Sequence, residues 1–258
     1  MVLSFILLMI CGTLCGFIDS SLGMGYGVTA ASVLVSFGIG PAIASASIHT
    51  AEAVVDTVSS GSHIKLGNIR KDLLIPLIAF GSAGAVLGAL GLTSLSTTIA
   101  RPIISAVLLV LGLLILYKYV YRWKKGNDTP AEGKKNYSRK ILILLGFLAG
   151  FVDAAGGGGW GPILTSTFVA TGSSPRKAVG TVEVSEPIIS VAAFVTFGIL
   201  IGFESFLWSL VIPILIGGII LTPVAAYVTA RMPRRWLGIL VGLWIAALNI
   251  RTLFMTFV

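Results

Sequence analysis

Long apolar stretches separated by short polar turns dominate the pattern along the chain. A membrane-spanning helix needs about 20 mostly apolar residues to cross a hydrocarbon core of about 30 Å. Two apolar segments, 2–40 and 141–172, are interrupted by clusters of glycine. Six others are continuous: 42–62, 73–93, 102–121, 178–200, 205–229 and 236–256. The pattern therefore predicts an all-α membrane protein with six full spans and two broken helical hairpins.

The two interrupted segments carry the same glycine-rich phrase, GFIDSSLGMGYG from Gly16 and GFVDAAGGGGWG from Gly150. At an offset of 134 residues the match extends over 16–56 and 150–190, and 12 of the 41 pairs are identical. The identical pairs include aspartate, glutamate and proline, which a bias toward small apolar residues does not readily supply. The chain therefore contains an internal repeat.

Each copy of the repeat starts with a glycine-broken hairpin and continues with three spans. Because three is odd, the second copy has to enter the membrane from the side opposite to the first. We therefore expect two inverted repeats, 1–122 and 140–258, joined by a basic cytoplasmic linker, 123–139, within one integrated membrane domain. Inverted repeats built around broken helices are a recurrent plan of secondary transporters.

Composition and charge agree with a protein embedded in a lipid bilayer and indicate its orientation. Only 11% of the residues are charged, and the mean hydropathy is +0.99. Of the 18 basic residues, 16 fall in loops that this threading places on one side, eight of them in 118–140. By the positive-inside rule that side is cytoplasmic, so both termini are expected on the opposite side of the inner (cytoplasmic) membrane. The net charge of +8 is thus a topology signal, and no nucleic-acid partner is expected.

The glycine clusters predict a substrate site, because non-helical backbone at membrane depth survives only when it is buried in protein or lines a cavity. We expect the helix 141–154 to end at the second cluster and a short helix to start near residue 161. Its free N–H groups and positive dipole end would face a small anion, and the first cluster would do the same from the other side. The predicted substrate-binding residues are Gly23, Met24, Gly25, Tyr26, Gly27, Gly157, Gly158, Gly159, Trp160 and Gly161.

Close helix packing is the alternative role for glycines in a membrane. Small residues at a spacing of four let two helix backbones approach each other. Gly12 with Gly16, and Gly84 with Gly88, fit that role. For the duplicated clusters, each with an aspartate nearby, we adopt the substrate-site interpretation.

Carboxylates at membrane depth are the second candidate feature. An aspartate at the centre of a membrane helix costs about 2.5–3.5 kcal/mol, so such residues face the protein interior and mark ion or proton pathways. Six of the ten acidic residues fall inside apolar segments: Asp19, Glu52, Asp56, Asp153, Glu183 and Glu186. No lysine or arginine is expected at this depth, so helix dipoles would have to attract the anion.

The spacing of the polar residues predicts one stripe along a single face of the helix 42–62. The stripe consists of Ser45, His49, Glu52, Asp56, Ser60 and His63, the last of which borders a basic turn and is expected in a loop. In the second copy Pro187 is expected to kink the helix and free backbone carbonyls. A histidine beside buried carboxylates suits a proton relay, so proton coupling is assigned to His49, Glu52, Asp56, Glu183 and Glu186.

Structural roles compete with these assignments. Asp19 and Asp153 each adjoin a helix break, so capping the break is as good an interpretation as a part in transport. The other carboxylates could serve to join helices by hydrogen bonds.

Other classes of site find little support in the chain. His49-x-x-Glu52 has metal-ligand types, but no second histidine is expected at membrane depth and the two cysteines are remote, so no metal site is predicted. No nucleophile–base constellation, phosphate-binding loop or cofactor motif is present. We therefore expect neither an enzyme nor a cofactor.

The residues around both breaks resemble the TauE/SafE sulfite exporter family, namely Gly16-Phe17-Ile18-Asp19 with Gly25, and Gly150-Phe151-Val152-Asp153 with Gly156–Gly159 and Pro162. The repeat architecture and the length agree over essentially the whole chain. The resemblance implies an integral membrane carrier for sulfite, thiosulfate or small organosulfonates, whose substrate site is lined by 23–27 and 157–161. Leu22, Met24 and Tyr26 interrupt the plainer glycine run of many relatives, which bears on the size of the substrate.

The combined interpretation is a secondary transporter of a small sulfur oxyanion, coupled to protons. Its main rival is a cation transporter that uses the carboxylates as ligands, and a scaffold subunit is a third class. A scaffold would not need a polar stripe through its centre. The sequence leaves open which anion is carried, the direction of flux and whether the chain forms a homo-oligomer.

Overall fold

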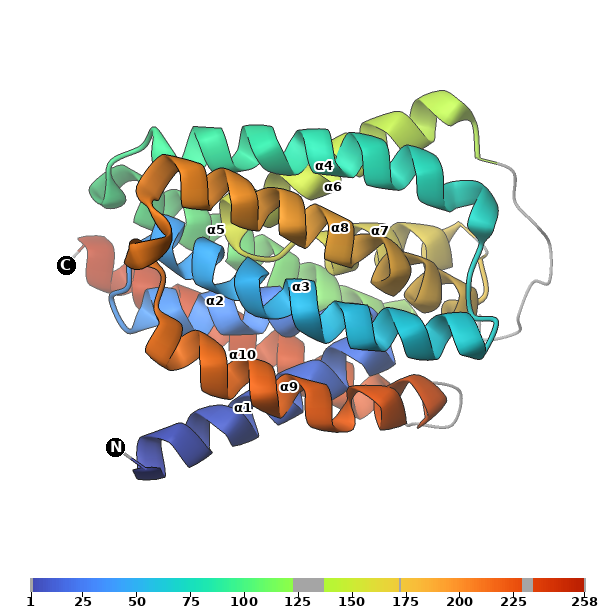
Figure 1. Cartoon of the computed structure of the whole chain (residues 1–258), viewed down its shortest axis with the longest axis horizontal. Helices are drawn as coiled ribbons and strands as arrows, with labels where there is room; N and C mark the ends of the chain where they lie inside the picture. Colours follow the sequence, from blue (N-terminus) through green and yellow to red (C-terminus); the bar gives the residue numbers. More distant parts are fainter. Residues whose placement is uncertain (1, 123–136, 172, 229–233, 258) are drawn as a thin grey trace.

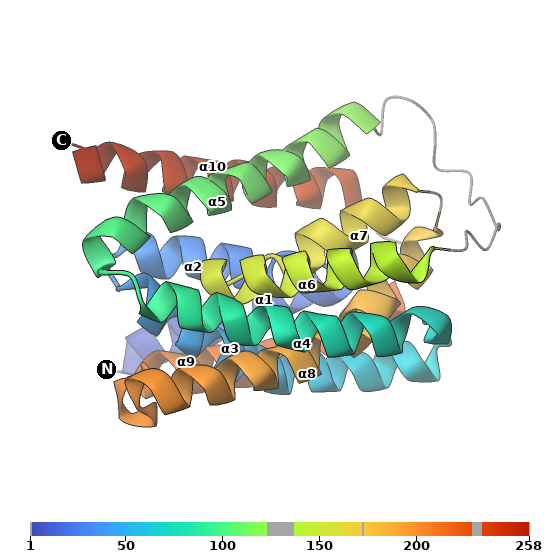
Figure 2. The same cartoon turned by 90° about the horizontal axis from the view of Figure 1, so that it is seen from above.

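The computed structural model describes residues 2–122, 137–171, 173–228 and 234–257, and in these ranges the chain is an all-helical bundle (Figures 1 and 2). The first half contains α1 (Val2–Leu22), α2 (Tyr26–Ser36), α3 (Pro41–Lys65), α4 (Lys71–Thr93), α5 (Thr97–Tyr117) and the π-helical turn η1 (Lys118–Arg122). The second half contains α6 (Arg139–Gly156), α7 (Trp160–Ala170), α8 (Pro175–Ile201), the 3₁₀ turn η3 (Phe203–Ser205), α9 (Trp208–Val228) and α10 (Arg234–Phe257). The predicted all-α class is confirmed. Most of the predicted linker, residues 123–136, lies outside the described residues.

The two halves have the same order of helices. Each begins with a long helix, a glycine break and an 11-residue helix, and three longer helices follow. The predicted break in the second half is confirmed, because α6 ends at Gly156 and α7 starts at Trp160. Gly23 and Gly25 in the first break, and Gly157 and Gly158 in the second, have positive φ angles, which glycine adopts without a steric cost.

Both hairpins turn back inside the molecule. α2 runs back toward the end of the bundle where α1 starts, and α7 runs back toward the opposite end, where α6 starts (Figures 1 and 2). α1 packs against α9 and α6 against α4, so each long hairpin arm lies on the helix in the same position of the other half. α3 packs on α8, and α5 on α10. These pairings are what the predicted two-fold repeat requires, while the inversion across a membrane stays a prediction.

Six of the described helices are long and apolar enough to cross a membrane: α1, α4, α5, α8, α9 and α10. Five of them match predicted spans. The expectation for 42–62 differs, because this segment lies in α3, whose 25 residues carry too many polar side chains to count as an apolar span. The sixth apolar helix is instead α1, which the sequence pattern assigns to the interrupted segment 2–40. Large apolar side chains such as Ile75, Ile199 and Phe254 point outward, as a lipid-facing surface requires.

Basic residues gather at one end of the bundle. The turn between α3 and α4 lies there beside the start of α8, since Arg176 donates to Leu66 O (2.8 Å) and Lys177 to Gly67 O (2.9 Å). α1 starts and α10 ends together at the opposite end (Figure 1). There Arg101 and Arg251 donate to Gly38 O (2.6 Å) and Ser36 O (3.1 Å) at the end of α2.

Helices approach closely where glycine removes the side chain. A β-carbon on Gly12 would lie 2.0 Å from Ile214 O, and one on Gly84 would lie 2.1 Å from Phe147 O. A β-carbon on Gly16 would lie 2.6 Å from Gly218 O, and one on Gly88 would lie 2.4 Å from Phe151 O. The predicted packing role of these four glycines is confirmed.

Gly150→Ala is expected to destabilise the protein, because the new methyl group would lie 2.1 Å from the backbone oxygen of Gly81. Overpacking of this kind costs about 1–3 kcal/mol, and the thermal unfolding temperature of the purified protein measures it. Gly91→Ala is the matched control, since its nearest neighbour is Phe151 Cζ at 3.9 Å, and alanine favours a helix over glycine. Equal losses in both variants would contradict this account.

Candidate functional site

The two glycine breaks touch each other by backbone contact. A β-carbon on Gly27 would lie 2.7 Å from Gly157 O and 2.8 Å from Gly158 Cα. The repeat-related contact has nearly the same distances, since a β-carbon on Gly161 would lie 2.5 Å from Gly23 O and 2.7 Å from Met24 Cα. The structure thus brings the ten predicted substrate-binding residues, 23–27 and 157–161, into one region. In this closed arrangement the glycines serve close packing, so a substrate between them requires the two breaks to separate.

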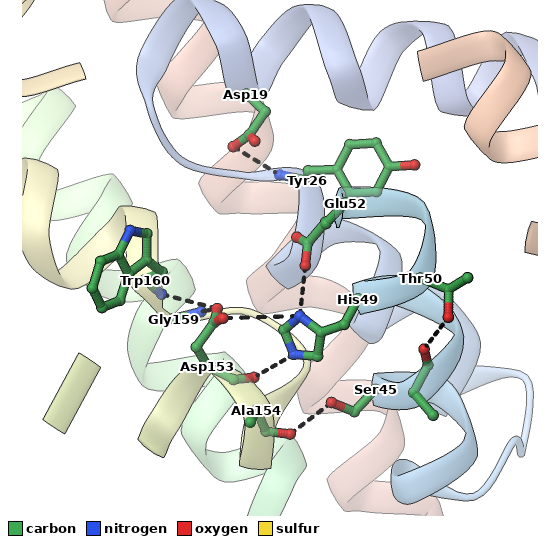
Figure 3. A network of polar contacts seen from close by, with 11 residues as sticks. Asp19, Tyr26, Ser45, His49, Thr50, Glu52, Asp153, Ala154, Gly159 and Trp160 are labelled. Carbon is green, nitrogen blue, oxygen red and sulfur yellow. Dashed lines mark hydrogen bonds and ion pairs between the residues drawn. The ribbon is translucent and has the colours of Figure 1, made fainter. Parts of the chain in front are cut away.

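An aspartate caps the short helix of each hairpin (Figure 3). Asp153 Oδ1 accepts hydrogen bonds from the N–H groups of Gly159 (2.7 Å) and Trp160 (3.0 Å), and Asp19 Oδ1 accepts one from Tyr26 N–H (3.2 Å). The N–H groups that the sequence predicts to be free are therefore occupied by carboxylates of the chain itself. A negative side chain at this position satisfies orphan donors and complements the helix dipole.

His49 links the two halves at this point (Figure 3). Its Nδ1 lies 2.9 Å from Glu52 Oε2 and 3.9 Å from Asp153 Oδ2, and its Nε2 lies 3.3 Å from the Asp153 carbonyl oxygen. The carbonyl oxygen can only accept, so Nε2 carries a hydrogen. Nδ1 and the Glu52 carboxylate form a close ion-pair contact, in which a proton can reside on the imidazole or on the carboxyl group. Glu52 also hydrogen-bonds to the backbone of Gly27 at the start of α2.

A second carboxylate cluster lies where α1, α3 and α8 meet. Asp19, Asp56 and Glu183 each offer an oxygen, and these oxygens lie within 4.8 Å of one another. Ser59 donates a hydrogen bond to Glu183 Oε2. Neither oxygen of Asp56 has a hydrogen-bond partner among the described residues. This cluster contains no basic side chain, in contrast to the cluster around His49.

The polar stripe of α3 faces the interior. Its members are at most 8% exposed: Ser45, His49, Glu52, Asp56, Ser60 and His63. Pro187 lies inside an uninterrupted α8 and has no N–H for the carbonyl of Glu183, which instead accepts a hydrogen bond from Ser60 (2.8 Å). The prediction of a freed carbonyl is confirmed. Glu186 is 4% exposed, and its carboxylate interacts electrostatically with Asp19 and Asp56.

Two basic side chains differ from expectation. His63 is fully buried in α3 rather than in a loop, with Nε2 3.2 Å from Ser20 O and Nδ1 3.2 Å from Asn68 Nδ2. The ammonium group of Lys118 in η1 lies 3.8 Å from the sulfur of Met24, so a cation reaches the first glycine break. The burial of His63 could have been predicted, because it continues the helical spacing of the stripe. The contact of Lys118 with Met24 could not, because nothing in the sequence links the two residues.

The clustering of Asp19, Asp56 and Glu183 was also missed. Spacing along the chain indicates metal ligands that lie on the same helix. These three residues come from three helices, so their spacing gives no such indication. The internal repeat does indicate a difference between the two halves. It pairs Glu183 with His49 and Asp56 with Ser190, so the two halves differ in chemistry at matching positions.

Comparison with known proteins agrees with this architecture. The family model of the sulfite exporter TauE/SafE matches residues 8–252. The chain belongs to this family. It is also 46% identical over 245 residues to the probable membrane transporter protein YtnM of Bacillus subtilis (strain 168), covering 94% of this chain and 80% of that protein. No solved structure matches. This TauE/SafE protein is therefore a multi-pass membrane transporter.

Asp153→Ala is expected to lower the thermal unfolding temperature of this family member, because the N–H groups of Gly159 and Trp160 lose their acceptor. Each buried hydrogen-bonding group left unsatisfied costs about 1–3 kcal/mol. Asp153→Asn keeps an oxygen acceptor, so its unfolding temperature should fall less than that of Asp153→Ala. Hydrogen exchange should quicken at the start of α7 in the alanine variant, and wild-type exchange there would count against the cap.

Proposed function

We propose that this transporter carries a small sulfur oxyanion, such as sulfite, thiosulfate or a small organosulfonate, across the cytoplasmic membrane together with protons. The family match supports the substrate class. The observation that carries the proposal is the pair of capped helix starts at the centre of the molecule, where Asp153 accepts from Gly159 and Trp160 and Asp19 accepts from Tyr26.

The capping carboxylates support an oxyanion as the ligand of these helix starts. A carboxylate oxygen that accepts two backbone N–H groups is a chemical stand-in for one oxygen of a sulfite ion. Helix N-termini bind oxyanions because their N–H groups and dipole converge on negative charge. In the proposed cycle the oxyanion replaces the carboxylate of Asp153 or Asp19. A carboxyl group that gains a proton gives up its place more easily, because it loses the charge that the helix start attracts.

The closed contact between the two breaks fits an occluded state. Gly27 against Gly158, and Gly161 against Met24, leave no space between them for a side chain. We propose that the contact opens toward one side of the membrane and then toward the other. Because the two contacts are equivalent by the repeat, the two open forms would have similar energies, as alternating access in inverted-repeat transporters needs.

The contact of His49 with Glu52 is the proposed site of proton coupling. A proton there can reside on either group, and Nδ1 of His49 lies 3.9 Å from Oδ2 of Asp153, the cap of α7. A proton passed from the imidazole to Asp153 would release the cap as the oxyanion arrives. Glu186 is the repeat counterpart of Glu52 and would serve the other half.

Cation transport is the second candidate. Six carboxylates that are at most 4% exposed favour it, since buried acidic side chains are common ion ligands. The capped helix starts count against it, because N–H groups repel cations. The anion proposal accounts for both features when protons or cations move with the anion.

Uptake of radiolabelled sulfite into liposomes containing the purified protein tests the proposal. Saturable uptake that increases with an imposed pH gradient is the expected result. Glu52→Gln removes the proton acceptor of His49, so at least about a hundredfold loss of gradient-driven uptake is expected, at the lower end of the 10²–10⁴-fold contribution of proton-transfer groups. Uptake of a cation without sulfite would favour the second candidate.

Glu204→Gln is the matched control for this experiment. Glu204 is an exposed glutamate in η3, outside the carboxylate clusters, so its neutralisation should leave sulfite uptake at the wild-type level. Equal losses from Glu52→Gln and Glu204→Gln would remove the support for His49 and Glu52 as the coupling site.

A further inference from the structure

The internal repeat places two related carboxylate clusters in the molecule, and they differ in charge. In one, His49 of α3 lies beside Asp153 of α6. The repeat pairs His49 with Glu183 and Asp153 with Asp19. In the second cluster Glu183 of α8 accordingly lies beside Asp19 of α1. A group that can carry a positive charge has been exchanged for one that carries a negative charge, at the same position of the fold.

The second cluster is closely built, and its three members are all carboxylates. Oxygens of Asp19, Asp56 and Glu183 lie within 4.8 Å of one another, and the three residues are at most 3% exposed. Glu183 Oε1 and both oxygens of Asp56 are buried and accept no hydrogen bond among the described residues. Buried charge of one sign is costly unless a counter-charge accompanies it. The unpartnered oxygens of Asp56 and Glu183 are thus suited to contact a positively charged ligand.

We propose that Asp19, Asp56 and Glu183 bind a sodium ion that moves with the anion. The ligands are all oxygens, which suits a hard cation and excludes a soft metal. The hydroxyl group of Ser59, which contacts both Glu183 and Ser20, offers a neutral oxygen at the edge of the cluster. A carrier has to release its ion in every cycle, which favours a monovalent cation over a divalent one.

Asp19 connects this ion site to the hairpin. Its Oδ1 accepts from Tyr26 N–H at the start of α2, while the same carboxylate belongs to the three-residue cluster. A sodium ion would therefore offset one negative charge in the cluster that contains the cap of α2. The role in transport rests on the proposed function, whereas the binding of sodium does not.

Binding of sodium to the purified full-length protein, without any substrate anion, tests the inference. Radioactive sodium binding and the thermal unfolding temperature are followed at fixed pH and ionic strength, with potassium or choline as replacement. Saturable sodium binding with a rise in unfolding temperature is expected. Asp56→Asn and Glu183→Gln should each weaken sodium binding at least about tenfold, because the affinity of oxygen sites depends on the number of charged ligands.

Asp153→Asn is the matched control. It removes the repeat counterpart of Asp19 and keeps an oxygen for the cap, so sodium binding should persist. Asp19→Asn makes the same chemical change in the second cluster and should weaken binding.

Four results would overturn the sodium site: no sodium-specific binding to the wild-type protein, equal weakening by Asp19→Asn and Asp153→Asn, displacement of sodium by far lower concentrations of calcium, or a response to protons alone. Sodium binding without sulfite uptake would leave the ion site standing and refute the substrate proposal. Sulfite uptake without sodium binding would do the reverse.

Discussion

The structure depends on one contact, the meeting of two polypeptide backbones at the centre of a membrane protein. Gly27 lies against Gly157 and Gly158, and Gly161 lies against Gly23 and Met24. Broken helices leave N–H groups that lipid cannot satisfy, so the breaks have to be covered by protein. Each hairpin covers the break of the other. Because no side chain intervenes, the carboxylates of Asp19 and Asp153 come close enough to face residues from the opposite half.

The surrounding electrostatics follow from this geometry. Six buried carboxylates lie in this part of the molecule, and His49 lies beside two of them, Glu52 and Asp153. Positions that the repeat pairs thus make similar backbone contacts and differ in charge. In one half an imidazole lies beside Glu52 and Asp153, whereas the cluster of Asp19, Asp56 and Glu183 consists of carboxylates. An asymmetric charge in a symmetric frame allows one half to handle a proton while the other handles a different ion.

Much of this arrangement is predictable from the sequence, and the rest depends on tertiary packing. Glycine runs and the period of the polar stripe are local, so the break before Trp160 and the buried face from Ser45 to Ser60 follow directly. Helical spacing cannot show which helices meet. The convergence of Asp19, Asp56 and Glu183 involves three helices, and the contact of Lys118 with Met24 joins residues far apart in the chain. Likewise, α3 is shielded by other helices, which an average of hydropathy along the chain does not reveal.

The self-capping of the hairpins bears on how the carrier behaves when it is empty. A transporter with bare N–H groups at its centre would need a bound ligand to reorient, and would act as an obligatory exchanger. Here Asp19 and Asp153 fill those positions from within the chain. An unloaded molecule therefore has little polar backbone to shield during the return step. Such a carrier is suited to net transport in one direction, with the return step made without substrate.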